Sequence, residues 1–138
     1  GEDAWFLAAL CRGSIGRALA MDPAGERQER TELAAVLERL PAMSDDELLT
    51  LADGVSKDRD GFLRIIDLSL ERLRDRLIRL HTSDERLLVF PAAAAGPAVP
   101  AGRVLRDLEL FSGSRRMLQG TVSASLIAEN LFLTLARS

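Results

Sequence analysis

The sequence predicts an all-α protein, a compact bundle of about five to seven helices around a long central helix. The first sign is residues 60–80, DGFLRIIDLSLERLRDRLIRL, where apolar residues recur at steps of three and four and so share one face of a helix. The second is a composition rich in Leu, Ala and Arg, all of which favour helix. The third is that no alternation of apolar and polar residues is long enough for a strand.

The predicted central helix, residues 60–80, has two halves of different character. Its apolar stripe consists of Phe62, Ile66, Leu70, Leu73, Leu77 and Leu80. In the first half, Leu63, Ile65 and Leu68 add apolar surface on the other sides, so we expect this half to be nearly surrounded. In the second half the other faces are charged, and we expect one side in water. These charged residues are Arg72, Arg74, Asp75, Arg76 and Arg79.

The segments before the central helix carry clear helix boundaries. Short helices are expected at residues 3–10 and 15–21, and Asp22-Pro23 is typical of the cap and first turn of a third helix, which Pro41 ends. Its buried face is predicted to hold Leu33, Val36, Leu37 and Leu40, with Glu26, Arg27, Glu29 and Arg30 outside. Ser44 to Glu47 forms a capping box for a fourth helix, which Gly54 closes. The apolar stripe of that helix is Leu48, Leu51, Ala52 and Val55. Asp58 or Asp60 starts the central helix.

Two helices are expected after a proline-rich connector at residues 91–102, which three prolines and two glycines keep from being helical. The first spans residues 103–119, is weakened near Gly113 and has an apolar face of Val104, Leu105, Leu108, Phe111 and Leu118. The second is capped by Thr121 or Ser123 and runs to about Ala136. Its apolar side is predicted to hold Leu126, Ile127, Leu131, Leu133 and Leu135.

Composition argues against several functional classes. The net charge of −3 gives no bulk attraction to nucleic acid or anionic lipid. With one cysteine, Cys11, and one histidine, His81, the chain lacks the partners for a zinc site or Cys/His catalysis, and no GxxxxGK phosphate loop is present. We therefore expect no catalytic residue, metal or cofactor. The longest uncharged run, residues 87–102, is too short for a membrane span, so a soluble, cytoplasmic protein is expected. Because the chain starts at Gly1 without Met, we expect it to be part of a longer protein.

The most unusual charge feature is a set of arginines on the last part of the central helix and on the helix that follows the connector. They are Arg72, Arg76, Arg79, Arg115 and Arg116. One interpretation is an ordinary solvated face. The other is a surface that recognises acidic groups on a partner subunit.

Two segments resemble a known family. Residues 13–19, GSIGRAL, follow an apolar helix and resemble the last helix of the lid subdomain in bacterial clamp-loader AAA+ proteins. In the nucleotide-binding members the pattern is Gly-Ser-x-Arg-Asp-Ala. Here Gly16 stands at the arginine position and Arg17 comes one residue later, which is similar to the delta-prime branch that does not hydrolyse ATP. Residues 118–133 resemble the closing pattern of the family, L-x-x-N-V-N-P-R-L-A-L-E-N-L-L-L. The matching residues are Val122, Leu126, Glu129, Asn130, Leu131 and Leu133.

The resemblance implies a division of the chain into the end of the AAA+ lid subdomain at residues 1–22 and a helical collar at residues 23–138. In this family the collars of five subunits form a ring that holds the DNA polymerase III clamp loader together during DNA replication. The implied role is oligomerisation with gamma/tau and delta subunits, without direct contact with nucleic acid or membrane and without catalysis. The candidate interface residues are Arg72, Arg76, Arg79, Phe111, Arg115, Arg116, Glu129 and Phe132.

Three alternatives remain open at this point. A gamma/tau collar has the same architecture, although Gly16 in place of the sensor arginine argues against it. An unrelated helical enzyme or small-ligand-binding domain would need polar groups gathered in an apolar pocket. A helix-turn-helix regulator would need a basic recognition helix, which the sequence does not indicate. For Phe111 and Phe132, the expectation covers either the interface itself or the core that supports it.

Overall fold

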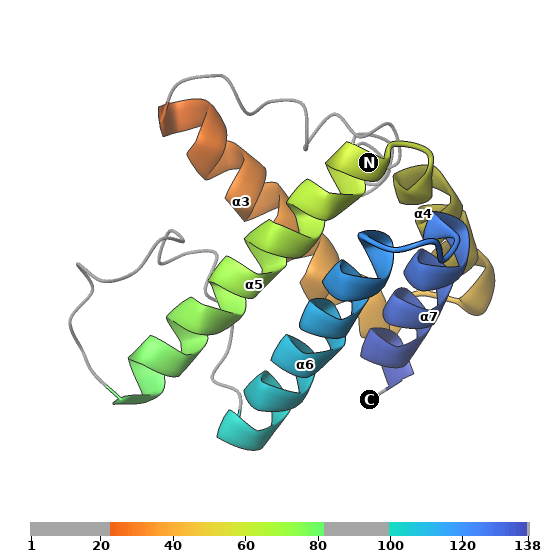
Figure 1. The fold of residues 1–138 in the computed structure, drawn as a ribbon. Coiled ribbons are helices and arrows are strands. Elements are labelled where there is room, and N and C mark those ends of the chain that lie inside the picture. The colour runs from red at the N-terminus through yellow and green to blue at the C-terminus, as the bar shows by residue number, and fades with distance from the viewer. Residues whose placement is uncertain (1–22, 82–99, 138) are drawn as a thin grey trace.

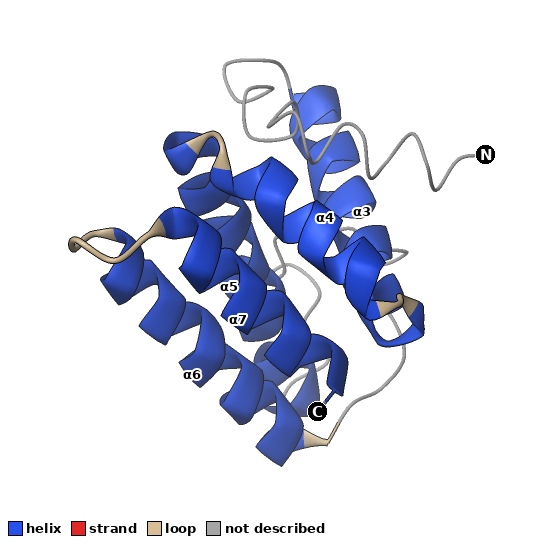
Figure 2. Cartoon of the chain, turned by 90° about the vertical axis from the view of Figure 1, so that its right-hand side faces the viewer, coloured by secondary structure: helices blue, strands red, loops and turns tan. Residues whose placement is uncertain are grey.

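The computed structural model describes residues 23–81 and 100–137, and every regular element in these ranges is helical (Figure 2). The elements are α3 (Pro23–Arg39), the 3₁₀ turn η2 (Leu40–Ala42), α4 (Asp45–Ser56), α5 (Arg59–His81), α6 (Ala101–Leu118) and α7 (Ala124–Arg137). The prediction of an all-α bundle is thus confirmed. The helices expected at residues 3–10 and 15–21, and residues 91–99 of the connector, lie outside the described residues.

The helices pack as a bundle in which α5 crosses α3 and lies beside α6, and α7 lies beside α4 (Figure 1). α5, the longest described helix with 23 residues, packs against α3, α4 and α6. α7 lies between α4 and α6 and also contacts η2. α5 and α6 are antiparallel, since Arg115 near the end of α6 pairs with Asp67 in the first half of α5. Contacts between helices that are far apart in the sequence therefore hold the bundle together.

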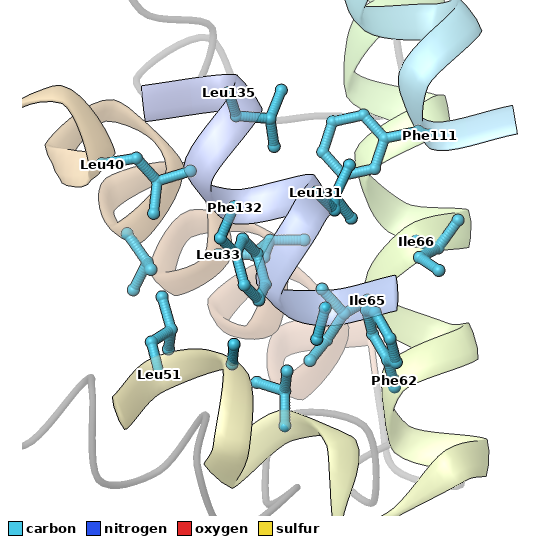
Figure 3. Packing of buried hydrophobic residues seen from close by; sticks show 14 of the residues in the cluster. Leu33, Leu40, Leu51, Phe62, Ile65, Ile66, Phe111, Leu131, Phe132 and Leu135 are labelled. Carbon is cyan, nitrogen blue, oxygen red and sulfur yellow. The ribbon is translucent and has the colours of Figure 1, made fainter. Parts of the chain in front are cut away.

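One continuous hydrophobic core connects these helices (Figure 3). The first half of α5 is nearly surrounded, as predicted, because Phe62, Ile65, Ile66 and Leu68 are at most 1% exposed. Phe132 of α7 lies against Phe62, with ring centroids 6.4 Å apart. The predicted stripe of α4 is also buried, and its members are Leu48, Leu51, Ala52 and Val55.

Two helix starts are fixed by hydrogen bonds that the sequence indicates. Ser44 and Glu47 form the predicted capping box: the Glu47 amide donates to Ser44 Oγ at 3.2 Å, and the Ser44 amide donates to Glu47 Oε1 at 3.1 Å. Asp58 caps α5 by accepting a hydrogen bond from the Gly61 amide at 3.1 Å. A methyl group at Gly61 would lie 2.8 Å from Asp58 Oδ2, so a larger residue there would force the capping carboxylate to shift.

Replacing Ser44 with Ala should lower the free energy of unfolding by about 1 kcal/mol, because it removes the acceptor for an amide at the start of α4. Urea unfolding measures this loss. Ser56→Ala, at the other end of the same helix, should cost less than about 0.5 kcal/mol. Equal losses for the two variants would contradict the cap.

Hydrogen bonds from the backbone and side chain of Ser44 lower the pKa of Glu47 below 4.5. The stability that ionised Glu47 gives to the folded state is therefore present above pH 4.5 and is lost as the pH falls through the lowered pKa.

Other predicted boundaries and faces differ from the structure. α6 begins at Ala101, two residues earlier than predicted, because the Pro100 carbonyl accepts hydrogen bonds from the amides of Arg103 and Val104 at 3.1 and 3.2 Å. α6 continues through Gly113 without a break. Leu105 and Leu126 were expected on apolar faces but are 55% and 59% exposed, because the described helices pack on other sides of α6 and α7.

The charged residues of α3 and α5 also differ from the expectation of water-facing sides. Glu29 is 2% exposed, Arg72 is 5% exposed and Asp75 is 4% exposed. The reason is that α3 packs against α5, and their charges pair across the contact: Arg64 Nη2 lies 3.1 Å from Glu29 Oε1, and Arg72 Nη2 lies 3.0 Å from Glu38 Oε1. Arg30, expected outside, reaches Glu71 of α5 at 3.2 Å.

None of the helices in residues 23–81 and 100–137 has both the length and the apolar character that crossing a membrane requires.

Candidate functional site: an arginine-lined pocket

A pocket of about 490 Å³ lies where α3, η2, α5, α6 and α7 meet. One part of its wall is apolar and includes Leu37, Leu73, Phe111 and Leu135. Figure 3 shows Phe111 and Leu135 on neighbouring helices, α6 and α7, at one side of the core. The rest of the wall is polar, and its residues are Glu38, Ser69, Arg72, Arg76, Arg103 and Asp107. The site thus joins an apolar surface to a group of charges.

Arg72 is the most deeply buried charge in the pocket wall. Its guanidinium donates a hydrogen bond from Nη2 to Glu38 Oε1 at 3.0 Å. Burial lowers the pKa of Arg72 to about 10, helped by the positive charge of Arg76 and opposed by Glu38 and Asp107. Arg72 therefore stays cationic at neutral pH, in surroundings that stabilise its charge less well than water does.

Arg76 and Asp107 line the same pocket from α5 and α6. Burial lowers the pKa of Arg76, and the charge of Arg103 adds to this effect, while Glu38 and Asp107 oppose it. Burial also raises the pKa of Asp107, although Arg103, Arg106, Arg76 and Arg72 all favour its ionised form. One oxygen of this carboxyl, Oδ1, is buried without a hydrogen-bond partner. The charges of Arg76 and Asp107 are thus less well stabilised in this pocket than they would be in water.

Two further features shape the polar wall. The hydroxyl of Ser69, which is 0% exposed, donates to the Ile65 carbonyl of its own helix at 2.8 Å. Pro100 lines the pocket, so the N-terminal end of α6 lies at its edge. The amides at such an end carry a partial positive charge, which adds to that of the arginines.

The structure brings only part of the predicted interface set to this pocket. Arg72, Arg76 and Phe111 line it together. Arg115 instead pairs with Asp67, with Nε to Oδ1 at 2.8 Å. Because α5 and α6 are antiparallel, Arg115 and Arg116 lie beside the first half of α5, away from Arg72 and Arg76. The expected arginine set is therefore not one continuous surface.

The remaining predicted residues have separate surroundings. Arg79 is exposed on α5, outside the pocket wall, and Glu129 is half-buried on α7. Phe111 and Phe132 are 2% and 1% exposed, so of the two alternatives considered for them they occupy the supporting core. Whether Arg79, Arg116 and Glu129 contact a partner stays a prediction.

Sequence reasoning missed Glu38, Arg103 and Asp107 as residues of one site. They lie on α3 and α6, and each has an ordinary charged position in its own helix. A signal that could have raised attention is the interruption of apolar periodicity by Arg72, which lies between buried neighbours of α5. Its partners become visible only when α3 and α6 are packed against α5.

A second surface feature lies where α6 turns into α7. Met117, Val122 and Leu126 are 40%, 37% and 59% exposed, and all belong to one ten-residue stretch of the chain. We call these three residues the 117–126 corner. Arg59 holds the end of α6 at this corner by donating from Nη2 to the carbonyls of Leu118 and of Gly120, the latter at 3.1 Å. The corner thus carries three exposed apolar side chains close together in the sequence, and Arg59 ties part of its backbone to α5.

Comparisons with protein-family models, with curated proteins and with solved structures give no match for this chain. In the part of the chain that the structure describes, no group of three or more His, Cys, Asp or Glu side chains is placed to hold a metal ion.

Proposed function

We propose that this chain is a subunit-interaction domain, the helical collar of a bacterial DNA polymerase III clamp loader, of the delta-prime branch. The proposal is supported by the resemblance of residues 118–133 to the closing pattern of that family and by an all-α bundle, which is the fold class expected of a collar. The other resembling segment, residues 13–19, lies outside the described residues.

The observation that carries the proposal is the 117–126 corner. Val122 and Leu126 match apolar positions of the family pattern, yet they are 37% and 59% exposed. The core of the described chain therefore does not account for their apolar character. Clustered exposed apolar residues are typical of protein–protein contacts, and these two positions lie four residues apart in the sequence. A neighbouring collar that covers the corner would explain both the pattern and the exposure.

The proposal names the gamma/tau and delta subunits as partners and assigns the chain a role in assembling the complex that loads the sliding clamp in DNA replication. It assigns no reaction, no cofactor and no direct contact with nucleic acid or membrane to this part of the protein. The location that goes with this role is the cytoplasm. A gamma/tau collar is the alternative within the same family.

The decisive measurement is the mass of the chain in solution, alone and mixed with the gamma/tau collar from the same organism. We expect a monomer that forms a mixed complex at micromolar concentrations. Leu126→Asp should weaken this complex by about tenfold or more, because it places a charge in an apolar contact. The isolated variant should keep its helical circular dichroism, since Leu126 is exposed.

Leu105→Asp is the matched control, because Leu105 is 55% exposed near the start of α6, at the other end of that helix from the corner. This variant should assemble as the unchanged chain does. Absence of any mixed complex at tens of micromolar, or equal weakening by the two variants, would contradict the proposed contact.

A further inference from the structure

We propose that the arginine-lined pocket binds a small organic monocarboxylate, a molecule with an apolar body and one carboxylate group. This inference is independent of the assembly role, because the pocket and the 117–126 corner are formed by different residues. Three properties of the pocket lead to it: its charge, the placement of its arginines and its apolar wall.

The charge of the wall suits a monoanion. Arg72, Arg76 and Arg103 supply three positive charges, and Glu38 and Asp107 supply two negative ones, which leaves one positive charge in excess. A ligand with a single negative charge makes the site neutral. A dianionic phosphate would exceed that charge and would lie close to two carboxylates. The N-terminal end of α6 at the pocket edge also favours a negative group.

The three arginines lie close together in the pocket wall. All three arginines line the same pocket, and the charge of Arg76 lowers the pKa of Arg72 while the charge of Arg103 lowers the pKa of Arg76, so neighbouring cations in the wall repel each other. Arg72 is 5% exposed, and little water reaches it. A guanidinium presents N–H donors in a fork that matches the two oxygens of a carboxylate. A carboxylate among these arginines would offset their repulsion.

The apolar wall and the size indicate the rest of the ligand. About 490 Å³ is within the range of small-molecule sites and is far more than a bare inorganic anion fills. Leu37, Leu73, Phe111 and Leu135 give an alkyl chain or a ring a surface to contact. The combination of this surface with the arginines distinguishes a carboxylate that carries an apolar body from a free inorganic ion.

The test is calorimetric titration of the full chain with octanoate at neutral pH, beside 1-octanol and octylammonium as probes of the same length. We expect octanoate to bind with a dissociation constant below about 1 mM. The two uncharged or cationic probes should bind at least about tenfold more weakly. Octyl phosphate and inorganic phosphate complete the series and should bind more weakly than octanoate.

Variants locate the binding. Arg103→Gln should weaken octanoate binding by about tenfold, whereas Arg116→Gln, which changes an exposed arginine at the other end of the same helix and outside the pocket wall, should change it by less than about twofold. Asp107→Asn should strengthen binding by about tenfold, because it removes a negative charge from the wall. A gain of affinity is not expected from a merely damaged fold, so this variant separates binding from structure.

The proposal is overturned if octanoate fails to bind below 1 mM, or if octanol binds as well as octanoate. It is also overturned if Arg103→Gln and Arg116→Gln behave alike, or if Asp107→Asn leaves the affinity unchanged. Tighter binding of octyl phosphate than of octanoate would contradict the assignment of a monoanion.

Discussion

Replacing Phe132 with Ala should lower the free energy of unfolding by about 3–5 kcal/mol, one of the two largest effects expected for a single substitution in this chain. Phe132 is 1% exposed, and its ring lies against that of Phe62. It belongs to α7, the helix between α4 and α6, so the cavity left by alanine would open where several helices meet (Figure 3). Rigid helices on several sides cannot all move inward to fill such a cavity.

Urea unfolding of the isolated chain measures this effect. Leu126→Ala is the matched control on the same helix, because Leu126 is 59% exposed and its truncation should cost less than about 0.5 kcal/mol. The pair also separates core from interface. If Phe132 served a partner instead of the core, its truncation would leave the isolated chain as stable as the control variant, and the packing described here would be refuted.

The second large effect is expected for Arg64→Met, which should cost about 3–5 kcal/mol at neutral pH. Arg64 Nη2 lies 3.1 Å from Glu29 Oε1, and the side chain of Glu29 is only 1% exposed. Glu29 Oε2 and Arg64 Nε are already buried without hydrogen-bond partners in the described structure. Methionine would leave the glutamate charge buried with its closest cation removed, and burying an unpaired charge is costly.

The cost of Arg64→Met should decrease as the pH falls. Burial raises the pKa of Glu29 above its ordinary 4.5, and the charge and hydrogen bond of Arg64 oppose that increase. Arg30, on α3 with Glu29, also opposes the increase in the pKa of Glu29, while Glu26 adds to the increase. Without Arg64 the folded-state pKa should rise further. The folded variant then favours protonated Glu29. The stability that this protonated form gives is fully present below pH 4.5 and is lost as the pH rises through the folded-state pKa.

The double variant Glu29→Met/Arg64→Met tests the cause. It removes both charges and keeps the volume of the site roughly constant, so most of the lost stability should return. The extra pH dependence of the single variant should disappear as well. If the double variant is as unstable as Arg64→Met, lost packing by the arginine stem explains the effect, and the buried-charge interpretation is wrong.

How much of the candidate site could be predicted differs between its residues. The sequence named Arg72, Arg76 and Phe111 as candidate residues of a subunit interface, and the structure places all three in one pocket wall. Their neighbours Glu38, Arg103 and Asp107 were not identified, because they come from α3 and α6 and are ordinary surface charges within their own helices. The pocket requires these helices to pack against α5, and no local pattern specifies that packing.

The sequence by itself determined which of the described segments are helical and where α4 and α5 begin. Apolar residues at steps of three and four set the buried sides of α4 and of the first half of α5, and Ser44 and Asp58 set where these helices begin. These features depend on neighbours within four residues, so a local pattern contains them. They account for the fold class and for most of the hydrophobic core.

Only the tertiary structure decided which charges are buried. Glu29 and Arg72 occupy positions that a single helix would turn to water, yet α3 and α5 cross so that each meets a partner of opposite sign. Leu126 shows the reverse, because an apolar position on α7 stays exposed where no described helix covers it. The physical reason is that burial depends on which helices come together in space, and long-range packing, unlike a cap or a stripe, has no short sequence pattern.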